Sequence, residues 1–294
     1  MVMLKSGFAN EMIPGLYDVI SDKFKLLPDV YSKIFTVRDS KRSYEEGQLI
    51  EGFGAASEKN ESAAVEYVDL TQGYKTTFTN LTYARGTRVS RECYDDDLYS
   101  VFKDKLGTYL ARSMKQRREV VAANVFNNGF ATTGADGKVL FATDHPYVSG
   151  GTYSNRLATG ADLSATSLQD LITVMETTLD PGSVNIQLIA KQLIVAPANR
   201  FNAKIILNSA QDPDSANNAI NPLKDEGISL QVWHYLTDAG IWILKADQHA
   251  AYYFNRQAPK LEADDDFDTG DAKIKITMRG VAGYDDPRGL AAST

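Results

Sequence analysis

The side chains with the clearest potential for chemistry are Asp144 and His145, which adjoin in the segment Thr143–Pro146. A carboxylate beside an imidazole could serve acid–base catalysis or hold a metal ion. Adjacent residues rarely point at one ligand, however, and no second histidine lies at helical or strand spacing from His145. We therefore favour a turn stabilised by Asp144, His145 and Pro146. A soluble hydrolase that uses Asp144 and His145 is the weaker alternative.

The other candidate residues give weaker signals. His234 lies in a strand-like segment and is expected to be a satisfied sheet histidine, whereas His249 is expected in an exposed loop. Cys93 is the only cysteine, which excludes an intrachain disulfide and a Cys-rich zinc site. A run of acids lacks the glycine and the twelfth-position glutamate of an EF-hand and is expected to be a solvated bend; it comprises Asp264, Asp265, Asp266 and Asp268. Nucleotide-binding and serine-nucleophile motifs are missing, so we expect no cofactor, no bound metal, no catalytic residue and no enzymatic activity.

The composition is that of a folded, water-soluble protein. The chain has 294 residues, of which 43% are hydrophobic and 23% charged, with a formal net charge of -7. The negative balance argues against a general nucleic-acid binder, although it leaves room for a local basic patch. The sequence has no secretion signal and no run of about 20 apolar residues. We expect a protein made in a reducing compartment, most simply the cytoplasm.

The longest helical pattern runs from about Asp97 to Asn128. Three aspartates at residues 95–97 offer N-cap acceptors, and apolar residues then recur at the i, i+3, i+4 spacing of one buried face. Gly129 supplies a stop signal. A helix of roughly 30 residues would be about 45 Å long, more than a compact domain needs for its own core. The remaining elements are arranged before and after this helix.

Four basic residues lie within two turns of this helix, with Glu119 as the only acid among them; they are Arg112, Lys115, Arg117 and Arg118. Three interpretations stay open. The residues form a solvated face, they pair with an acidic segment of a neighbouring copy, or they face enclosed nucleic acid.

An N-terminal arm and an acidic hairpin precede the helix. Residues 1–45 have scattered apolar anchors, with a short amphipathic helix expected at Pro14–Phe24. Residues 46–73 show two short runs of alternating apolar and polar residues between glycines, which is typical of a long two-stranded hairpin. From Glu45 to Asp69 there are seven acids and one base, Lys59. Neither segment can bury its apolar side chains alone, so both need a docking surface.

After the helix, the pattern alternates irregularly between strands and helices, which favours an α+β fold over a doubly wound sheet. One strand is expected at Tyr74–Arg91, before the helix. The others are expected at 139–141, 186–196, 251–254 and 273–279, and a hairpin should join 228–235 to 241–246. Helices are expected at 164–179 and 197–208, the second with Phe201, Ile205 and Ile206 facing inward.

The succession of arm, acidic hairpin, long helix and mixed domain resembles the major capsid protein of tailed bacteriophages, whose fold is shared with encapsulins and the herpesvirus capsid floor. Short segments resemble the Mu-like major head subunit group more closely. They are Val139–Pro146, Gly150-Gly151, Ser154-Asn155, Leu163-Ser164, Ser167-Leu168, Leu193–Pro197 and the strand near Trp242 with Ala246-Asp247. The resemblance extends over nearly the whole chain, from about residue 10 to residue 285.

The resemblance implies an α+β, tailed-phage major capsid fold. It assigns an N-terminal arm (1–45), an extended loop (46–78), a peripheral domain (79–141) with a spine helix at about 97–128, an axial domain (142–248), and a return to the peripheral domain (249–294).

The resemblance also implies a function. Such a subunit, a phage or prophage product, builds hexamers and pentamers that close into an icosahedral virion shell around double-stranded DNA, and it assembles in the bacterial cytoplasm. Its expected partners are copies of itself, a separate scaffolding protein and a portal, with a decoration protein as a further candidate; no membrane is expected. An encapsulin-like compartment is the alternative. The residues expected at contacts between subunits are Phe24, Leu49, Ile50, Phe53, Glu58, Glu61, Val65, Tyr67, Arg112, Lys115, Arg117 and Arg118.

Overall fold

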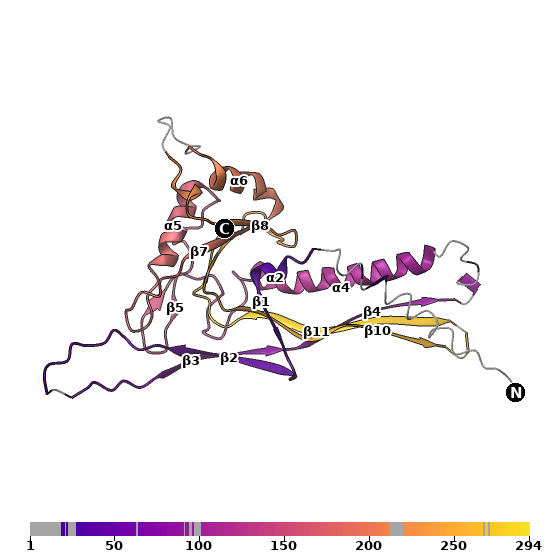
Figure 1. The fold of residues 1–294 in the computed structure, drawn as a ribbon, viewed down its shortest axis with the longest axis horizontal. Coiled ribbons are helices and arrows are strands. Elements are labelled where there is room, and N and C mark those ends of the chain that lie inside the picture. The colour runs from indigo at the N-terminus through magenta and orange to yellow at the C-terminus, as the bar shows by residue number, and fades with distance from the viewer. Residues whose placement is uncertain are drawn as a thin grey trace. The chain divides into compact units, whose positions relative to one another are not determined.

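A computed structural model describes residues 19–20, 22, 28–62, 64–90, 92–93, 96, 101–211, 220–266, 268–269 and 271–294. The chain divides into two compact units (Figure 1). Unit 1 contains the described parts of Met1–Glu45, Thr79–Ala122 and Tyr253–Ala282. Unit 2 contains those of Glu46–Phe78, Ala123–Tyr252 and Gly283–Thr294.

Unit 1 is built from a four-stranded sheet and a long helix, α4 (Val101–Asn127). The strand order is β1 (Thr36–Asp39), β10 (Ala251–Asp265), β11 (Ala272–Tyr284) and β4 (Leu81–Val89). Side chains of β11 alternate between buried and more exposed positions, as expected for a strand with one covered face. The buried side chains form one core with those of α4, and Figure 1 shows α4 running along this sheet. The core includes Leu110, Ala111, Met114, Ala272, Ile274, Ile276 and Met278.

The long helix predicted from the sequence is confirmed. Its described part begins at Val101, and residues 97–100 lie outside the described residues. Near Gly129, where a stop was expected, the backbone N–H donates to the Phe126 carbonyl. A Cβ on Gly129 would lie 2.7 Å from the Phe141 ring, so this close approach requires glycine.

Unit 2 is built around a second four-stranded sheet, in the order β12 (Leu290–Ser293), β9 (Trp242–Ala246), β7 (Ala190–Val195) and β8 (Ser229–Val232). The helices α5 (Ala165–Glu176) and α6 (Arg200–Asn208) pack against it around one apolar core. Side chains of Ser164 and Ser167 form a capping box at the start of α5, in agreement with the predicted helix start. Two short 3₁₀ helices, η1 (Pro197–Asn199) and η2 (Pro222–Lys224), flank α6.

The predicted hairpin between 228–235 and 241–246 is wrong. Strand β8 pairs in parallel with β7, and β9 pairs with β7 and β12, so β7 separates the two strands. A parallel pair needs a crossover connection, and α6 supplies it. The small-residue strand β12 was not predicted. The expected strand at 139–141 is wrong as well, because only an isolated bridge joins Val139 to Thr133.

Other expectations need smaller corrections. The single strand expected at Tyr74–Arg91 is divided at Asn80 into β3 (Thr71–Thr79) and β4, because the Asn80 amide donates to Ser40 Oγ and the Arg42 carbonyl. Strand β3 pairs with β2 (Tyr44–Glu51) in a two-stranded ribbon. Residues 251–254 and 273–279 are parts of the much longer strands β10 and β11.

Phe201 and Ile205 do not face inward as predicted. They are 70% and 54% exposed, and Ile206 alone of the three is buried. The expected helix at 14–24 lies almost wholly outside the described residues. None of the described helices is long and apolar enough to span a membrane.

The remaining short elements are the helix α2 (Tyr31–Ile34) in unit 1 and the paired strands β5 (His145–Pro146) and β6 (Thr152–Tyr153) in unit 2.

Candidate functional site

The most exposed apolar segment of unit 2 is the connection between β2 and β3, which we call the projecting loop (residues 52–70). Residue 63 is not described, and the remaining residues have no helix or strand. In Figure 1 the loop extends away from the β2–β3 ribbon. Its start is fixed by Glu51, which is 3% exposed. The Glu51 carboxylate accepts the backbone N–H groups of Val148 at 2.6 Å and Ser149 at 3.1 Å.

Close backbone approach also fixes the base of the projecting loop. A Cβ on Gly52 would lie 2.7 Å from Asp180 Oδ2, and a Cβ on Gly182 would lie 2.4 Å from the Gly54 Cα atom. The contact between Gly182 and Gly54 joins backbone to backbone, so only glycine fits at Gly182 without displacing the loop. The glycines that suggested a hairpin from sequence therefore seat the loop on the segment after α5.

A partly buried ion cluster supports that segment. Arg288 donates from Nε and Nη2 to the Asp286 carboxylate, with the closest contact at 2.7 Å, and also to the Asp180 carboxylate. Burial opposes the charge on Arg288, but the hydrogen bonds and charges of Asp286 and Asp180 raise its pKa overall. Nearby, burial raises the pKa of Tyr147 to about 12, and its hydroxyl donates to the Leu179 carbonyl. The base of the loop is thus a fixed, hydrogen-bonded platform.

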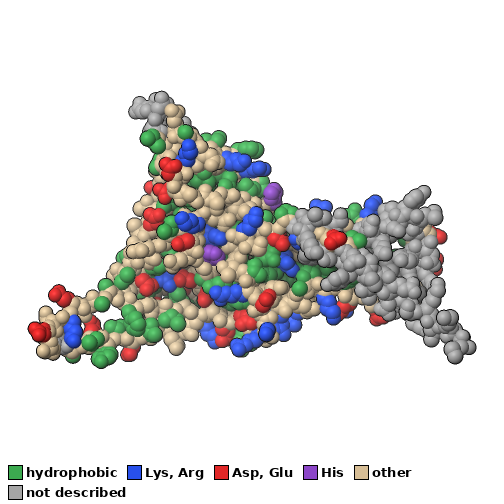
Figure 2. All heavy atoms as spheres, in the orientation of Figure 1, with side chains coloured by type: hydrophobic (Ala, Val, Ile, Leu, Met, Phe, Trp, Pro, Cys, Tyr) green, Lys and Arg blue, Asp and Glu red, His purple; other side chains and the backbone are tan. Residues whose placement is uncertain are grey.

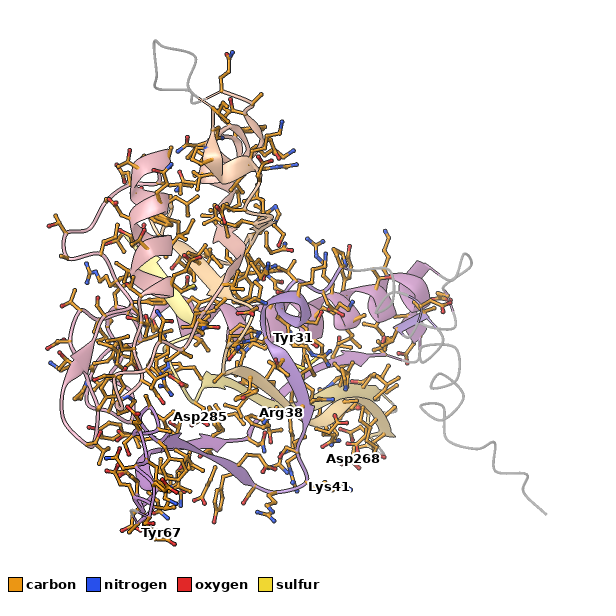
Figure 3. The ribbon with its side chains drawn as sticks, turned by 60° about the vertical axis from the view of Figure 1, so that its left-hand side comes forward. Tyr31, Arg38, Lys41, Tyr67, Asp268 and Asp285 are labelled. Carbon is orange, nitrogen blue, oxygen red and sulfur yellow. The ribbon has the colours of Figure 1, made fainter. Side chains whose placement is uncertain are left out.

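Beyond its base, the projecting loop exposes apolar side chains. Tyr67 is 94% exposed and Phe53 54%, and Val65, Val68 and Leu70 are also exposed, as is Ile50 on the adjoining strand β2. Figure 2 shows hydrophobic and acidic side chains gathered on the loop, and Tyr67 is labelled on it in Figure 3. The loop encloses a hollow of 610 Å³ lined only by its own residues, among them Phe53, Val65 and Tyr67. Glu58 and Glu61 are exposed on the same loop, and Leu49 is half-buried on β2.

The basic run of α4 has partners within unit 1. Lys115 is 5% exposed, and its Nζ lies 3.2 Å from Asp29. The buried Glu119 carboxylate accepts the N–H groups of Val30 at 2.7 Å and Tyr31 at 3.2 Å. These contacts hold the segment before α2 against the long helix. We call Lys115, Arg118 and Glu119 the arm-binding face.

Arg118 belongs to this face because it contacts Tyr31 twice. Its Nη1 donates to the Tyr31 hydroxyl at 3.1 Å, and the guanidinium lies 5.7 Å from the ring centroid. Burial raises the Tyr31 pKa, although the Arg118 charge opposes that shift. The Tyr31 ring also packs against the Tyr253 ring, with 4.8 Å between the ring centroids. The sequence did not indicate this partner, because Tyr31 and Arg118 lie 87 residues apart.

The other two basic residues of the run remain accessible. Arg112 is exposed, and Arg117 is exposed while its guanidinium lies 4.8 Å from the centre of the Tyr83 ring. Of the residues expected at subunit contacts, the structure therefore brings Lys115 and Arg118 to the subunit's own arm and leaves Arg112 and Arg117 on the surface. Phe24 lies outside the described residues.

Asp144 and His145 do not form a shared site. Asp144 pairs with Lys138, whereas the His145 side chain is 1% exposed and its Nδ1 lies 2.5 Å from Asp136 Oδ2. The His145 Nε2 lies 3.2 Å from both the Leu140 carbonyl and Asn155 Oδ1. Both ring nitrogens therefore have partners inside unit 2, so neither nitrogen is accessible to a substrate.

Asp136 and Asn155 are the partners of His145 that sequence reasoning missed. Burial would raise the Asp136 pKa, but the hydrogen bonds from His145 and from the Lys138 N–H lower it overall. The Asn155 amide donates to the carbonyls of Leu140 at 2.7 Å and Leu290 at 3.0 Å. The predicted local turn is in fact a buried polar junction that joins three parts of unit 2. Its function is structural.

The remaining candidates do not form a reactive site. His234 is exposed beyond the end of β8, so the prediction of a sheet histidine is wrong. His249 is half-buried; burial and, to a lesser degree, Lys245 lower its pKa to about 4. Cys93 is free and half-buried. Asp266 pairs with Lys273, and the described residues contain no cluster of three metal-binding side chains.

Comparison with known proteins agrees with the fold. Residues 73–293 match the model of a family described as phage capsid protein. Because this match covers most of the chain, the protein belongs to the phage capsid protein family. It has the tailed-phage major capsid fold and is a major capsid protein, the subunit that self-assembles into the phage shell. No curated protein matches the chain.

Solved structures show the same fold at low sequence identity. The capsid of a native GTA particle has a TM-score of 0.62 and 12% identity, covering 90% of this chain and 89% of that one. The decorated capsid of bacteriophage JBD30 has a TM-score of 0.59 and 15% identity, covering 72% and 92%. A virus-like particle from Pyrococcus furiosus has a TM-score of 0.55 and 10% identity, covering 96% and 98%.

Proposed function

We propose that this capsid protein forms the hexamers and pentamers of an icosahedral shell that encloses double-stranded DNA. Assembly takes place in the cytoplasm of a bacterial host, with a separate scaffolding protein and a portal, and the protein has no enzymatic activity. A decoration protein is a further candidate partner, since the similar JBD30 capsid is decorated with minor capsid protein trimers. The family membership and the shell-forming relatives support this proposal.

The segments take distinct roles in the proposal. Residues 1–45 are the N-terminal arm and 46–78 the extended loop. The peripheral domain comprises 79–141, with its spine helix, and 249–294, and the axial domain comprises 142–248.

One observation carries the proposal: the projecting loop has a fixed base and an apolar outer part. Exposed apolar patches on soluble proteins commonly mark interaction sites, and the loop encloses a hollow that no other part of the described chain lines. In a shell of identical subunits, the body of the neighbouring copy can cover these side chains. The proposed contact residues are Leu49, Ile50, Phe53, Val65 and Tyr67 of the loop region, together with Phe24 of the arm.

The acids of the loop and the accessible basic residues of α4 form the proposed polar part of the same contact. Glu58 and Glu61 of one copy would face Arg112 and Arg117 of its neighbour, which would favour correct pairing and rapid encounter. Lys115 and Arg118 would act indirectly, by holding the arm against α4.

The test is electron microscopy of the purified protein and of the variant F53S/Y67S. The native protein should form closed shells. The variant should remain folded, because both side chains are exposed in the subunit, but its shell yield should fall by at least about tenfold as two central contacts are lost. T71S/T77S, which changes two residues of the adjoining strand β3, is the matched control and should assemble normally. Native yields from F53S/Y67S would contradict the role of the loop.

An encapsulin-like compartment is the second candidate, because the chain also aligns over 96% of its length with a virus-like particle from Pyrococcus furiosus. The ratio of absorbance at 260 and 280 nm separates the candidates. Particles purified from phage-producing cells should contain double-stranded DNA, and particles that contain only protein cargo would favour the compartment.

A further inference from the structure

Two helices of unit 2 present solvent faces of opposite charge. On α5 the exposed positions include Thr166, Asp170, Thr173, Glu176 and Thr177, so its charged side chains are both acidic. On α6 the exposed positions include Arg200, Phe201, Lys204 and Ile205, so its charged side chains are both basic. Figure 2 shows acidic side chains over α5, and basic and hydrophobic ones over α6.

The face of α6 is unusual for a free surface. Ala203, Ile206 and Leu207 fill the buried side, which leaves Phe201 at 70% exposure and Ile205 at 54% on the opposite side. The Arg200 guanidinium lies 5.8 Å from the Phe201 ring centroid, so a cation and an exposed aromatic ring occur together. Arginine and large aromatic residues are enriched in the central contacts of protein interfaces.

The basic face borders a hollow. Arg200, Lys204 and His234 line a depression of 540 Å³ between α6 and β8, which is an edge strand of its sheet. An acidic side chain entering there would meet two permanent cations. The partner for this surface should therefore present carboxylates on a rigid element.

The face of α5 has that chemistry. Asp170 and Glu176 project from a helix whose position is fixed by its capping box and its buried side. The hydroxyls of Thr173 and Thr177 donate to the carbonyls of Gln169 and Thr173, so their hydrogen-bonding needs are met within the helix. The Asn202 amide donates to the Leu163 carbonyl at 2.7 Å, which ties α6 to the segment before α5. Both faces are thus held on one rigid core.

Rings of identical subunits require heterologous contacts, in which one surface of each copy meets a different surface of the next. We propose that the acidic face of α5 in one subunit docks against the basic and apolar face of α6 in the neighbouring copy within a capsomer. The charges select this pairing and disfavour α5–α5 and α6–α6 contacts, while Phe201 and Ile205 supply apolar burial. This proposal rests on the proposed function, because it assumes rings of copies in a shell.

Reciprocal charge reversal tests the pairing. K204E places an acid opposite Asp170 and Glu176, and D170K places a base opposite Arg200 and Lys204. Each should reduce the yield of shells by at least about tenfold, because like charges oppose each other at a specific interface. Every copy of K204E/D170K carries both changes, so this double variant should recover most of the assembly.

Folding and charge have separate controls. Because the altered side chains are exposed, the midpoint of thermal unfolding should shift by no more than about 2 °C, as is usual for surface substitutions. K191E changes an exposed lysine of β7 that lies on neither helix, and it should assemble as the native protein does.

The outcomes separate the two proposals. Native shells combined with normal assembly of K204E and D170K would overturn the α5–α6 contact and leave the shell function intact. Recovery in the double variant would support the contact. If the native protein forms only rings or small oligomers, the proposed shell is wrong. The α5–α6 contact is then tested by sedimentation velocity, which shows whether K204E/D170K recovers the oligomer that K204E and D170K lose. A native protein that stays monomeric would overturn both.

Discussion

The arm-binding face of α4 and the base of the projecting loop contain the same hydrogen-bonding arrangement, but it holds segments of different kinds. In each, a buried glutamate accepts two consecutive backbone N–H groups: Glu119 from Val30 and Tyr31, and Glu51 from Val148 and Ser149. Glu119 fastens a segment whose Tyr31 ring is itself buried against unit 1. Glu51 fastens the start of a loop whose outer part is exposed. The Glu119 hydrogen bonds hold the arm within the subunit. The Glu51 hydrogen bonds fix the start of a loop whose apolar side chains remain exposed.

The comparison shows which surface features indicate a partner. The basic run is conspicuous in the sequence because four charges lie close together, yet Lys115, Arg117 and Arg118 contact residues of the same chain. The apolar residues of the loop belong to a segment for which the sequence already indicated a docking surface, and within the described part of the subunit they remain exposed. A chain readily forms ion pairs within itself, whereas exposed apolar side chains on a projecting loop commonly mark an interaction site.

Replacing Glu119 should produce the largest loss of stability. E119A removes the carboxylate that accepts the N–H groups of Val30 and Tyr31, at a position that is 4% exposed. Hydrogen bonds to charged groups contribute about 1.5–3 kcal/mol each, so the free energy of unfolding of the unassembled protein should fall by about 3 kcal/mol, measured by urea denaturation.

E119Q is the matched control, because its amide retains an oxygen that can accept one of the two N–H groups. It should lose clearly less stability than E119A. An E119A protein as stable as the native one would show that the arm segment is not held by this carboxylate.

Replacing Glu51 should affect assembly more than stability. E51A frees the N–H groups of Val148 and Ser149, which lie near the surface and can bind water, so a loss of about 1–2 kcal/mol is expected. Because the loop then loses its fixed exit direction, the shell yield measured by electron microscopy should fall several-fold.

E46A removes an exposed carboxylate on the same strand β2, where Glu46 pairs with Lys75 at 2.8 Å. Exposed pairs contribute about 0–1 kcal/mol, so both stability and assembly should stay near native values. If E51A and E46A assemble equally well, the buried carboxylate does not direct the loop.

Local signals explain what the sequence could predict. The apolar spacing within α4 and the Ser164–Ser167 cap of α5 act within a few residues, so both helices were predicted near their observed positions. The parallel pairing of β8 with β7, the short strand β12 and the contacts of Asp29 with Lys115 join residues far apart in the chain. No local pattern specifies such pairings, and the orientation of α6 likewise depends on where the rest of unit 2 supplies a core. This is why Phe201 was assigned to the wrong face.

The smallest effect on stability is expected at Arg112 and Arg117, the two exposed residues of the basic run. Their replacement also gives the sharpest test of the comparison between α4 and the projecting loop. R112E/R117E alters two exposed side chains, so the loss of unfolding free energy should not exceed about 1 kcal/mol, mainly from the contact of Arg117 with Tyr83. Assembly should nevertheless fall, because the acidic loop of a neighbour would meet like charge. Adding E58K/E61K should restore part of the shell yield, whereas K41E/K191E, with an equal change in charge elsewhere, should assemble normally.

Normal folding without rescue would mean that the acidic loop does not dock on α4. Normal shells with reduced DNA content would instead assign Arg112 and Arg117 to the packaged nucleic acid.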